Sequence, residues 1–130
     1  MCYIDDYAHH PEEIKASLKA VRSIFPDKKL TLVFQPHLFS RTKDFMDGFA
    51  EALSLADSLL LMEIYPAREK PMPGVTSSAL LEKISCKEKQ ICQKENLIET
   101  IKKMKPELIV TMGAGDIDRF VPQIETLLES

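Results

Sequence analysis

The sequence predicts an α/β domain built around a mainly parallel sheet, with helices on both faces. Apolar runs of strand length alternate with segments of helical periodicity along the whole chain. Several runs are continuously apolar, as is typical of strands buried on both faces of a parallel sheet. Strands and helices that alternate at this spacing need crossover connections, which make the strands parallel. With 130 residues, 45% of them hydrophobic, the chain can form a single domain with its own core.

Five strands are expected. A short one opens the chain and runs into Asp6, and three apolar runs follow at wide spacing. The segment between Cys86 and Cys92 is ambiguous, and we interpret it as a weak edge strand. The expected strands cover residues 1–5, 30–34, 58–64, 86–92 and 108–112.

Helices are expected between the strands. Pro11 suits the first position of a helix, and the two glutamates after it favour the positive end of the helix dipole. Ser40 or Thr42 can cap the second helix, and the proline-rich stretch 66–74 interrupts the pattern as a loop. The expected helices run from 11 to about 25, from 40 or 42 through 53, from 76 or 77 through 84, from 96 to 105 and from 116 to 129.

Composition excludes several function classes. Seventeen basic and twenty acidic residues leave a net charge of −3, so no large basic surface for nucleic acid or acidic lipid is expected. We find no apolar run that could span a bilayer and no signal-peptide pattern. Three cysteines at irregular spacings fit reduced thiols in a cytoplasmic protein. The sequence also lacks the G-x-x-x-x-G-K-[ST] phosphate loop.

Chemically active side chains follow the expected strands. Ligands of parallel sheets bind outside the carboxyl ends of the strands, and these ends share one edge. All three histidines of the chain lie in these turns. The convergence predicts a functional site at that edge. The residues involved are Asp5, Asp6, Tyr7, His9 and His10 after the first strand; Gln35, Pro36, His37 and Arg41 after the second; Glu63, Tyr65, Pro66 and Arg68 after the third; and residues 113–116 after the last.

Each of these features also has a structural interpretation. His9 and His10 could cap a helix or bind a metal, and one of the two is expected to be structural, because adjacent histidines rarely point the same way. Cys2 with His9 and His37 matches no standard zinc spacing, which disfavours a metal site. The turn at 113–116 lacks the third glycine of a dinucleotide fingerprint, so a redox cofactor is disfavoured. A tight turn capped by Asp116 and a ligand contact both remain open there. Arg41, in the first turn of its helix, is unfavourable for the dipole, which suggests an anionic partner beside the alternative of a surface arginine.

Four motifs, in order, resemble the C-terminal domain of the Mur ligases, and in particular the members that join L-alanine to UDP-N-acetylmuramate. They are DDYAHHP at 5–11, FQPHLFSRT at 34–42, YPAREKPMPG at 65–74 and MGAGDI at 112–117. The resemblance runs from about Ile4 to the C-terminus. It implies a Rossmann-like, three-layer domain in which residues 1–130 form one unit.

The resemblance also implies an activity. In such ligases ATP phosphorylates the carboxylate of UDP-N-acetylmuramate, and L-alanine attacks the acyl phosphate, in the cytoplasm, as a step of peptidoglycan biosynthesis. The phosphate loop and the Mg²⁺ ligands belong to a central domain and the sugar nucleotide to an N-terminal one. These two domains, absent from this chain, would be its partners. The chain alone is therefore expected to fold but not to hydrolyse ATP or form a peptide bond.

The resemblance also implies roles for individual residues, matched position by position in the four motifs. The resemblance implies that Asp6 holds the ribose hydroxyls of ATP, that Tyr7 lies along the adenine, and that His9 faces the phosphate and acyl-transfer region. His37 and Arg41 would face the reaction centre, with Arg41 a candidate for the carboxylate of the amino acid, because a guanidinium matches a carboxylate bidentately.

One departure and two alternatives accompany this interpretation. Many members have arginine and tyrosine where this chain has Leu38 and Phe39, so Arg41 would carry more of the anion binding. A related ligase that recycles ready-made peptides shares the first motif, but the segment Gln35-Pro36-His37 argues against it. A stand-alone flavodoxin-like binding domain would bind nucleotides by itself.

Overall fold

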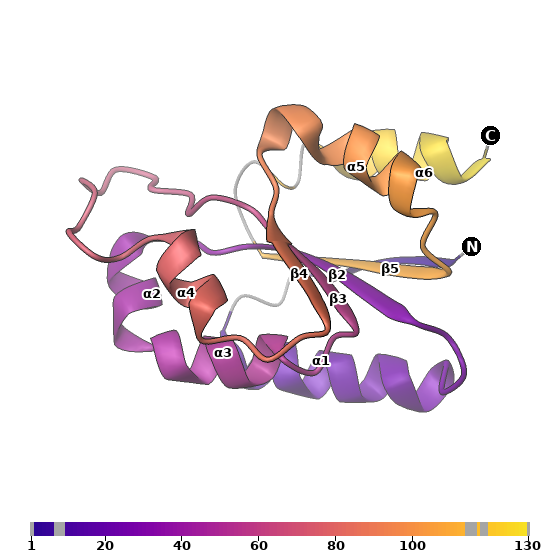
Figure 1. Ribbon diagram of the computed structural model, residues 1–130, viewed down its shortest axis with the longest axis horizontal. Helices are drawn as coiled ribbons and strands as arrows, with labels where there is room; N and C mark the ends of the chain where they lie inside the picture. The colour runs from indigo at the N-terminus through magenta and orange to yellow at the C-terminus, as the bar shows by residue number, and fades with distance from the viewer. Residues whose placement is uncertain (1, 7–9, 114–116, 118–119, 130) are drawn as a thin grey trace.

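The fold is a five-stranded sheet in which every neighbouring pair of strands is parallel (Figure 1). The computed structural model describes residues 2–6, 10–113, 117 and 120–129. The strand order across the sheet is β1-β5-β2-β3-β4, which places β4 at one edge, as expected for the weak fourth strand. The strands are β1 (Cys2–Asp6), β2 (Leu30–Gln35), β3 (Ser58–Leu61), β4 (Glu88–Ile91) and β5 (Leu108–Gly113).

Helices cover both faces of the sheet, so the three-layer prediction is confirmed. In Figure 1, α5 and α6 lie above the sheet, and α1 and α3 lie below it. Among the described residues, no helix is long and apolar enough to cross a membrane. The helices are α1 (Pro11–Ile24), α2 (Phe39–Asp44), α3 (Met46–Leu53), α4 (Ser77–Glu82), the 3-10 turn η1 (Lys94–Asn96), α5 (Leu97–Met104) and α6 (Val121–Glu129).

Two apolar clusters, one on each face, hold the layers together. Along β2, Leu32 and Phe34 pack toward α1 and α3, whereas Val33 packs toward α5 and α6. Strands β2, β3 and β5 are buried throughout, which explains why their sequences are mainly apolar and do not alternate with exposed polar residues. Each large apolar side chain buried in this way stabilises the fold by roughly 1.5–3 kcal/mol.

The start of α1 confirms that one of the two adjacent histidines is structural. His10 occupies the N-cap position, and its Nδ1 accepts a hydrogen bond from the backbone N–H of Glu12 at 3.3 Å. In return, the Glu13 carboxylate accepts one from the backbone N–H of His10 at 3.2 Å. The His10 ring also packs edge-on against Phe45, with ring centroids 4.9 Å apart. His10 is therefore a structural residue.

The second expected helix differs from the prediction. It is broken at Phe45 into α2 and α3, and its N-cap is Leu38, which makes no side-chain capping bond. The predicted caps are wrong: Thr42 lies inside α2 and donates its hydroxyl back to the carbonyl of Leu38 at 2.8 Å, while Ser40 bonds to a distant loop. A cap supplied from elsewhere in the chain leaves no local sequence signal.

Two further boundaries of secondary-structure elements differ from the prediction. The third strand ends at Leu61 rather than at residue 64, although the N–H of Met62 still donates to the carbonyl of Phe34 at 2.9 Å. The last helix begins at Val121 rather than at residue 116. Asp116, the expected cap of the final turn, lies outside the described residues.

Candidate functional site

The carboxyl ends of the strands are joined by one buried amide. Gln35, the last residue of β2, is 3% exposed. Its Oε1 accepts a hydrogen bond from the backbone N–H of Ile117 at 2.8 Å, and its Nε2 donates to the carbonyl of Glu63 at 3.2 Å. A single side chain thus ties the end of β2 to the segments that follow β3 and β5. The predicted convergence of these turns at one edge is confirmed.

The sheet has a topological switch point beside Gln35. Strand β2 leads to α2 and α3 on one face, and the neighbouring β5 leads to α6 on the other. Such a switch point opens a crevice at the carboxyl ends of the two strands, where ligands of open α/β sheets bind. Gly113, the β5 partner of Gln35, has φ +113°, so the backbone at this crevice suits glycine.

The loop after β3 lies against the segment that carries His37. Those two segments form a parallel bridge between His37 and Tyr65, whose rings stack with centroids 5.7 Å apart and planes 14° apart. The backbone N–H of Leu38 donates to the carbonyl of Tyr65, and the N–H of Tyr65 donates to the carbonyl of Pro36, both at 2.8 Å. The second and third motifs of the sequence therefore form one structural unit.

The turn that enters α2 has an unusual backbone. Leu38 adopts φ +72°, a conformation that costs a residue with a side chain roughly 1–3 kcal/mol and persists only where surrounding contacts impose it. Those contacts come from Tyr65 and from Glu69. The Glu69 carboxylate accepts hydrogen bonds from the backbone N–H of Ser40 at 3.0 Å and from its hydroxyl at 2.5 Å. These bonds lower the pKa of Glu69 and keep it ionised.

Arg41 comes directly after Ser40 in α2 and is partly buried. Within the described residues, its guanidinium makes no hydrogen bond or ion pair, so its charge is available to an anion. The position of Arg41 in its helix is not unfavourable for the dipole, contrary to the expectation from the sequence. Because α2 has only six residues, Arg41 also belongs to its last turn, where a cation is favourable.

Other expected site residues fall elsewhere. Asp5 accepts a hydrogen bond from the Thr111 hydroxyl at 2.8 Å and so joins β1 to β5. Asp6 ends β1 as the partner of Met112, one residue before Gly113, but its side chain lies outside what the structure describes. Tyr7 and His9 also lie outside the described residues. Across the described part of the chain, no three His, Cys, Asp or Glu side chains are grouped to hold a metal ion.

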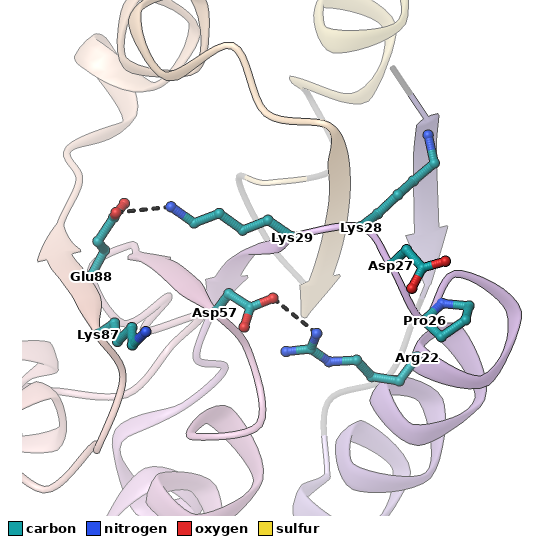
Figure 2. Close-up of a pocket in the computed structure, with 8 residues that line it drawn as sticks. All are labelled: Arg22, Pro26, Asp27, Lys28, Lys29, Asp57, Lys87 and Glu88. Atoms are coloured by element: carbon teal, nitrogen blue, oxygen red, sulfur yellow. Dashed lines mark hydrogen bonds and ion pairs between the residues drawn. The ribbon is translucent and has the colours of Figure 1, made fainter.

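A hollow of about 480 Å³ lies at the opposite end of the strands, around the starts of β2, β3 and β4. Figure 2 shows that most of its acidic and basic side chains pair with one another. Arg22 bonds to Asp57 at 2.9 Å, and Lys29 bonds to Glu88 at 2.8 Å. Burial opposes ionisation of Asp57, but hydrogen bonds from Arg22 and from the N–H of Leu30 outweigh it and lower its pKa. This hollow is stabilised by ion pairs, and we do not assign chemistry to it.

Two contacts of this edge were not predicted from the sequence. The sequence predicts Gln35 at this edge but not its hydrogen bonds, although an amide at the end of a buried apolar strand must find partners. Glu69 lies within a motif of the sequence, but no local signal connects it to Ser40, 29 residues earlier.

Comparison with known proteins agrees with this architecture. A family model described as Mur ligase, glutamate ligase domain, matches residues 1–115. The chain is 56% identical over 129 residues to UDP-N-acetylmuramate–L-alanine ligase of Cytophaga hutchinsonii, covering 99% of this chain and 28% of the relative.

Two solved structures have a similar fold. UDP-N-acetylmuramate-alanine ligase of Thermotoga maritima matches with a TM-score of 0.69 and 29% identity, over 95% of this chain and 26% of that one. A murein peptide ligase of Psychrobacter arcticus matches with a TM-score of 0.72 and 25% identity over the same shares. The chain thus spans little more than a quarter of the length of these three proteins.

Proposed function

The chain belongs to the Mur ligase family, as the C-terminal domain of such a ligase, and from this membership we propose that it serves an ATP-dependent enzyme that joins L-alanine to UDP-N-acetylmuramate. The observation that carries the proposal is the 56% identity, over nearly the whole chain, to a ligase named for that reaction. Because the chain spans 28% of that relative, the activity is proposed for the larger protein. A cytoplasmic location is part of the same proposal.

The proposed reaction forms one amide bond. Transfer of a phosphoryl group from ATP converts the carboxylate of UDP-N-acetylmuramate into an acyl phosphate, and ADP leaves. The amine of L-alanine then attacks the acyl carbon, loses a proton, and displaces inorganic phosphate. In this scheme the C-terminal domain binds and orients the reactants, while the phosphate loop and the Mg²⁺ ligands come from the rest of the protein.

Arg41 is proposed to bind the carboxylate of L-alanine. Its guanidinium has no ionic partner among the described residues, it is partly buried, and it follows the turn that leaves β2 at the ligand-binding edge. A guanidinium can hold a carboxylate through two parallel hydrogen bonds, which fixes the orientation of the amino acid. His37, stacked on Tyr65 in the same unit, is proposed to line the reaction centre, and His9 to face the phosphate.

ATP is proposed to bind beside β1. Asp6 would accept hydrogen bonds from the ribose hydroxyls, and Tyr7 would lie along the adenine. The backbone supports this assignment, since Asp6 ends β1 next to the crevice between β2 and β5. A nucleotide held there would lie at the same edge as His37 and Arg41.

The test uses the full-length protein and the 130-residue chain side by side. Phosphate release is measured with ATP and UDP-N-acetylmuramate, with and without L-alanine. We expect the full-length protein to release phosphate in an alanine-dependent manner and the chain alone to release none. Turnover by the chain alone would refute the assignment of the phosphate loop to another domain.

A recycling ligase is the second candidate, because the murein peptide ligase has an equally similar fold. It predicts that the full-length protein uses a ready-made peptide in preference to L-alanine. A stand-alone binding domain predicts instead that calorimetry detects nucleotide binding to the 130-residue chain. Competition between L-alanine and peptide in the full-length assay, followed by product identification, separates the two ligases.

A further inference from the structure

The helix that carries Arg41 begins without a cap of its own. Its N-cap residue, Leu38, has an apolar side chain and makes no capping bond. Backbone N–H groups in the first turn of a helix need acceptors, and a helix of six residues is too short to be stable by itself. The position of α2 therefore depends on contacts from outside the helix.

Glu69 supplies the missing acceptor from the loop after β3. One carboxylate oxygen accepts the N–H of Ser40 at 3.0 Å, and the other accepts its hydroxyl at 2.5 Å. A carboxylate at this end of a helix also interacts favourably with the helix dipole. Glu69 thus acts as a cap supplied from 29 residues away, and it holds the residue directly before Arg41.

The same contacts leave Arg41 available. Both oxygens of Glu69 are bonded to Ser40, and the described residues contain no ion pair between Glu69 and Arg41. A glutamate paired with the guanidinium would compete with a substrate carboxylate. A glutamate bonded to the adjacent residue instead fixes the backbone and leaves the cation free.

We propose that Glu69 is a positioning residue whose bonds to Ser40 set the direction in which Arg41 meets the carboxylate of the amino-acid substrate. This role rests on the function proposed above and extends it to the loop after β3. A misplacement of about 1 Å can cost a factor of about 100 in rate. Loss of the Glu69 contacts therefore impairs the use of the amino acid, although Glu69 itself does not touch the substrate.

The main test is Glu69→Met in the full-length protein. A methionine keeps the length of the side chain but has no carboxylate acceptor, so the backbone N–H and the hydroxyl of Ser40 both lose their partner. We expect the KM for L-alanine to rise about tenfold or more, by the same misplacement argument, while the KM for ATP stays within about twofold. Glu99→Met is the matched control, because Glu99 is exposed on α5 and makes no hydrogen bond or ion pair within the described chain.

A second readout does not depend on activity. Amide hydrogen exchange of the 130-residue chain reports whether the N–H of Ser40 is protected, and Glu69→Met should remove that protection while the strands keep theirs. Ser40→Ala, which deletes only the hydroxyl, is the milder variant should Glu69→Met not fold. It should raise the KM for L-alanine less, and its effect should not add to that of Glu69→Met.

The outcomes separate the two proposals. Loss of Ser40 protection with an unchanged KM for L-alanine would make Glu69 merely structural and overturn its positioning role. Equal rises in the KM of all three substrates would overturn it as well. A wild-type protein that protects Ser40 but does not use L-alanine would refute the proposed function instead, and the positioning role would fall with it.

Discussion

Gly113 of β5 lies so close to the carbonyl oxygen of Gln35 in β2 that any side chain on Gly113 would overlap it. A Cβ atom there would also lie 3.1 Å from the backbone nitrogen of Gln35. These two residues pair in the sheet. After them the chain continues to opposite faces of the sheet, to α2 from β2 and to α6 from β5. The close backbone approach is therefore part of the crevice that we propose as the site.

Gly113→Ala should destabilise the domain by about 3 kcal/mol or more, because backbone overlap adds to the strain of φ +113°. Gly74→Ala is the matched control. Gly74 has φ +77°, but a Cβ atom there meets nothing within 4 Å, so only the conformational cost of about 1–2 kcal/mol is expected. Urea unfolding of both variants measures the difference. Equal losses of stability would contradict the close approach.

Replacing Gln35 tests the amide that joins the strand ends. Gln35→Met keeps the size of the side chain but leaves the buried N–H of Ile117 without its acceptor, which should cost about 2–3 kcal/mol. Gln90→Met, at an exposed position of edge strand β4, should change stability by less than about 0.5 kcal/mol. Denaturant unfolding of the two variants provides the comparison, and similar values would argue against the hydrogen-bond network.

The ion pair between Asp57 and Arg22 predicts a pH-dependent contribution to stability (Figure 2). The pKa of Asp57 is lower in the folded protein than its ordinary value of 3.8. Its carboxylate therefore stabilises the fold above about pH 4, and the contribution is lost as the pH falls through the folded-state pKa. Since the pair is partly exposed and screened, we expect about 1 kcal/mol or less.

The corresponding measurement compares wild type with Asp57→Asn at several pH values. The difference in unfolding free energy should be constant at neutral pH and shrink below about pH 4. Asp27→Asn is the matched control, because Asp27 is an exposed position in the same hollow that makes no ion pair among the described residues. A difference in unfolding free energy that grew toward low pH would contradict the lowered pKa of Asp57.

Lys105, which follows α5, offers a stabilising change. It has φ +47° and ψ +59°, a left-handed conformation that costs a residue with a side chain about 1–2 kcal/mol. Lys105→Gly should raise the unfolding free energy by about 0.5–1 kcal/mol after the greater freedom of glycine in the unfolded chain is subtracted. Lys103→Gly, inside the same helix, should lower it by about 1 kcal/mol. Thermal unfolding distinguishes these opposite shifts.

Arg41→Ala in the full-length protein should lower kcat/KM for L-alanine by an amount equivalent to about 2–4 kcal/mol, because a charge-assisted contact with the carboxylate is lost. Lys43→Ala removes an exposed cation from the same short helix and should leave the kinetics unchanged. Asp6→Asn should instead affect the KM for ATP. Kinetics of Arg41→Ala that match wild type would remove Arg41 from the site.

Local patterns in the sequence were sufficient for most of the architecture. Apolar runs and helical stripes identified all five strands, the helices on both faces and the parallel arrangement, because burial on one or two faces imposes a periodicity on neighbouring residues. Pro11 and the glutamates after it located the start of α1 for the same local reason. The edge that carries His37 and Arg41 followed from topology alone.

Tertiary structure decided how that edge is assembled. The left-handed conformation of Leu38, the capping of α2 by Glu69 and the bonds of Gln35 all depend on groups that meet only after folding. Ser40 and Glu69 are 29 residues apart, and Gln35 and Ile117 are 82 apart. A hydrogen bond between such distant residues leaves no periodic trace in the chain. The sequence by itself therefore determined the sheet and the edge at which the candidate site residues gather, whereas long-range contacts decided how the backbone and side chains of that edge are held.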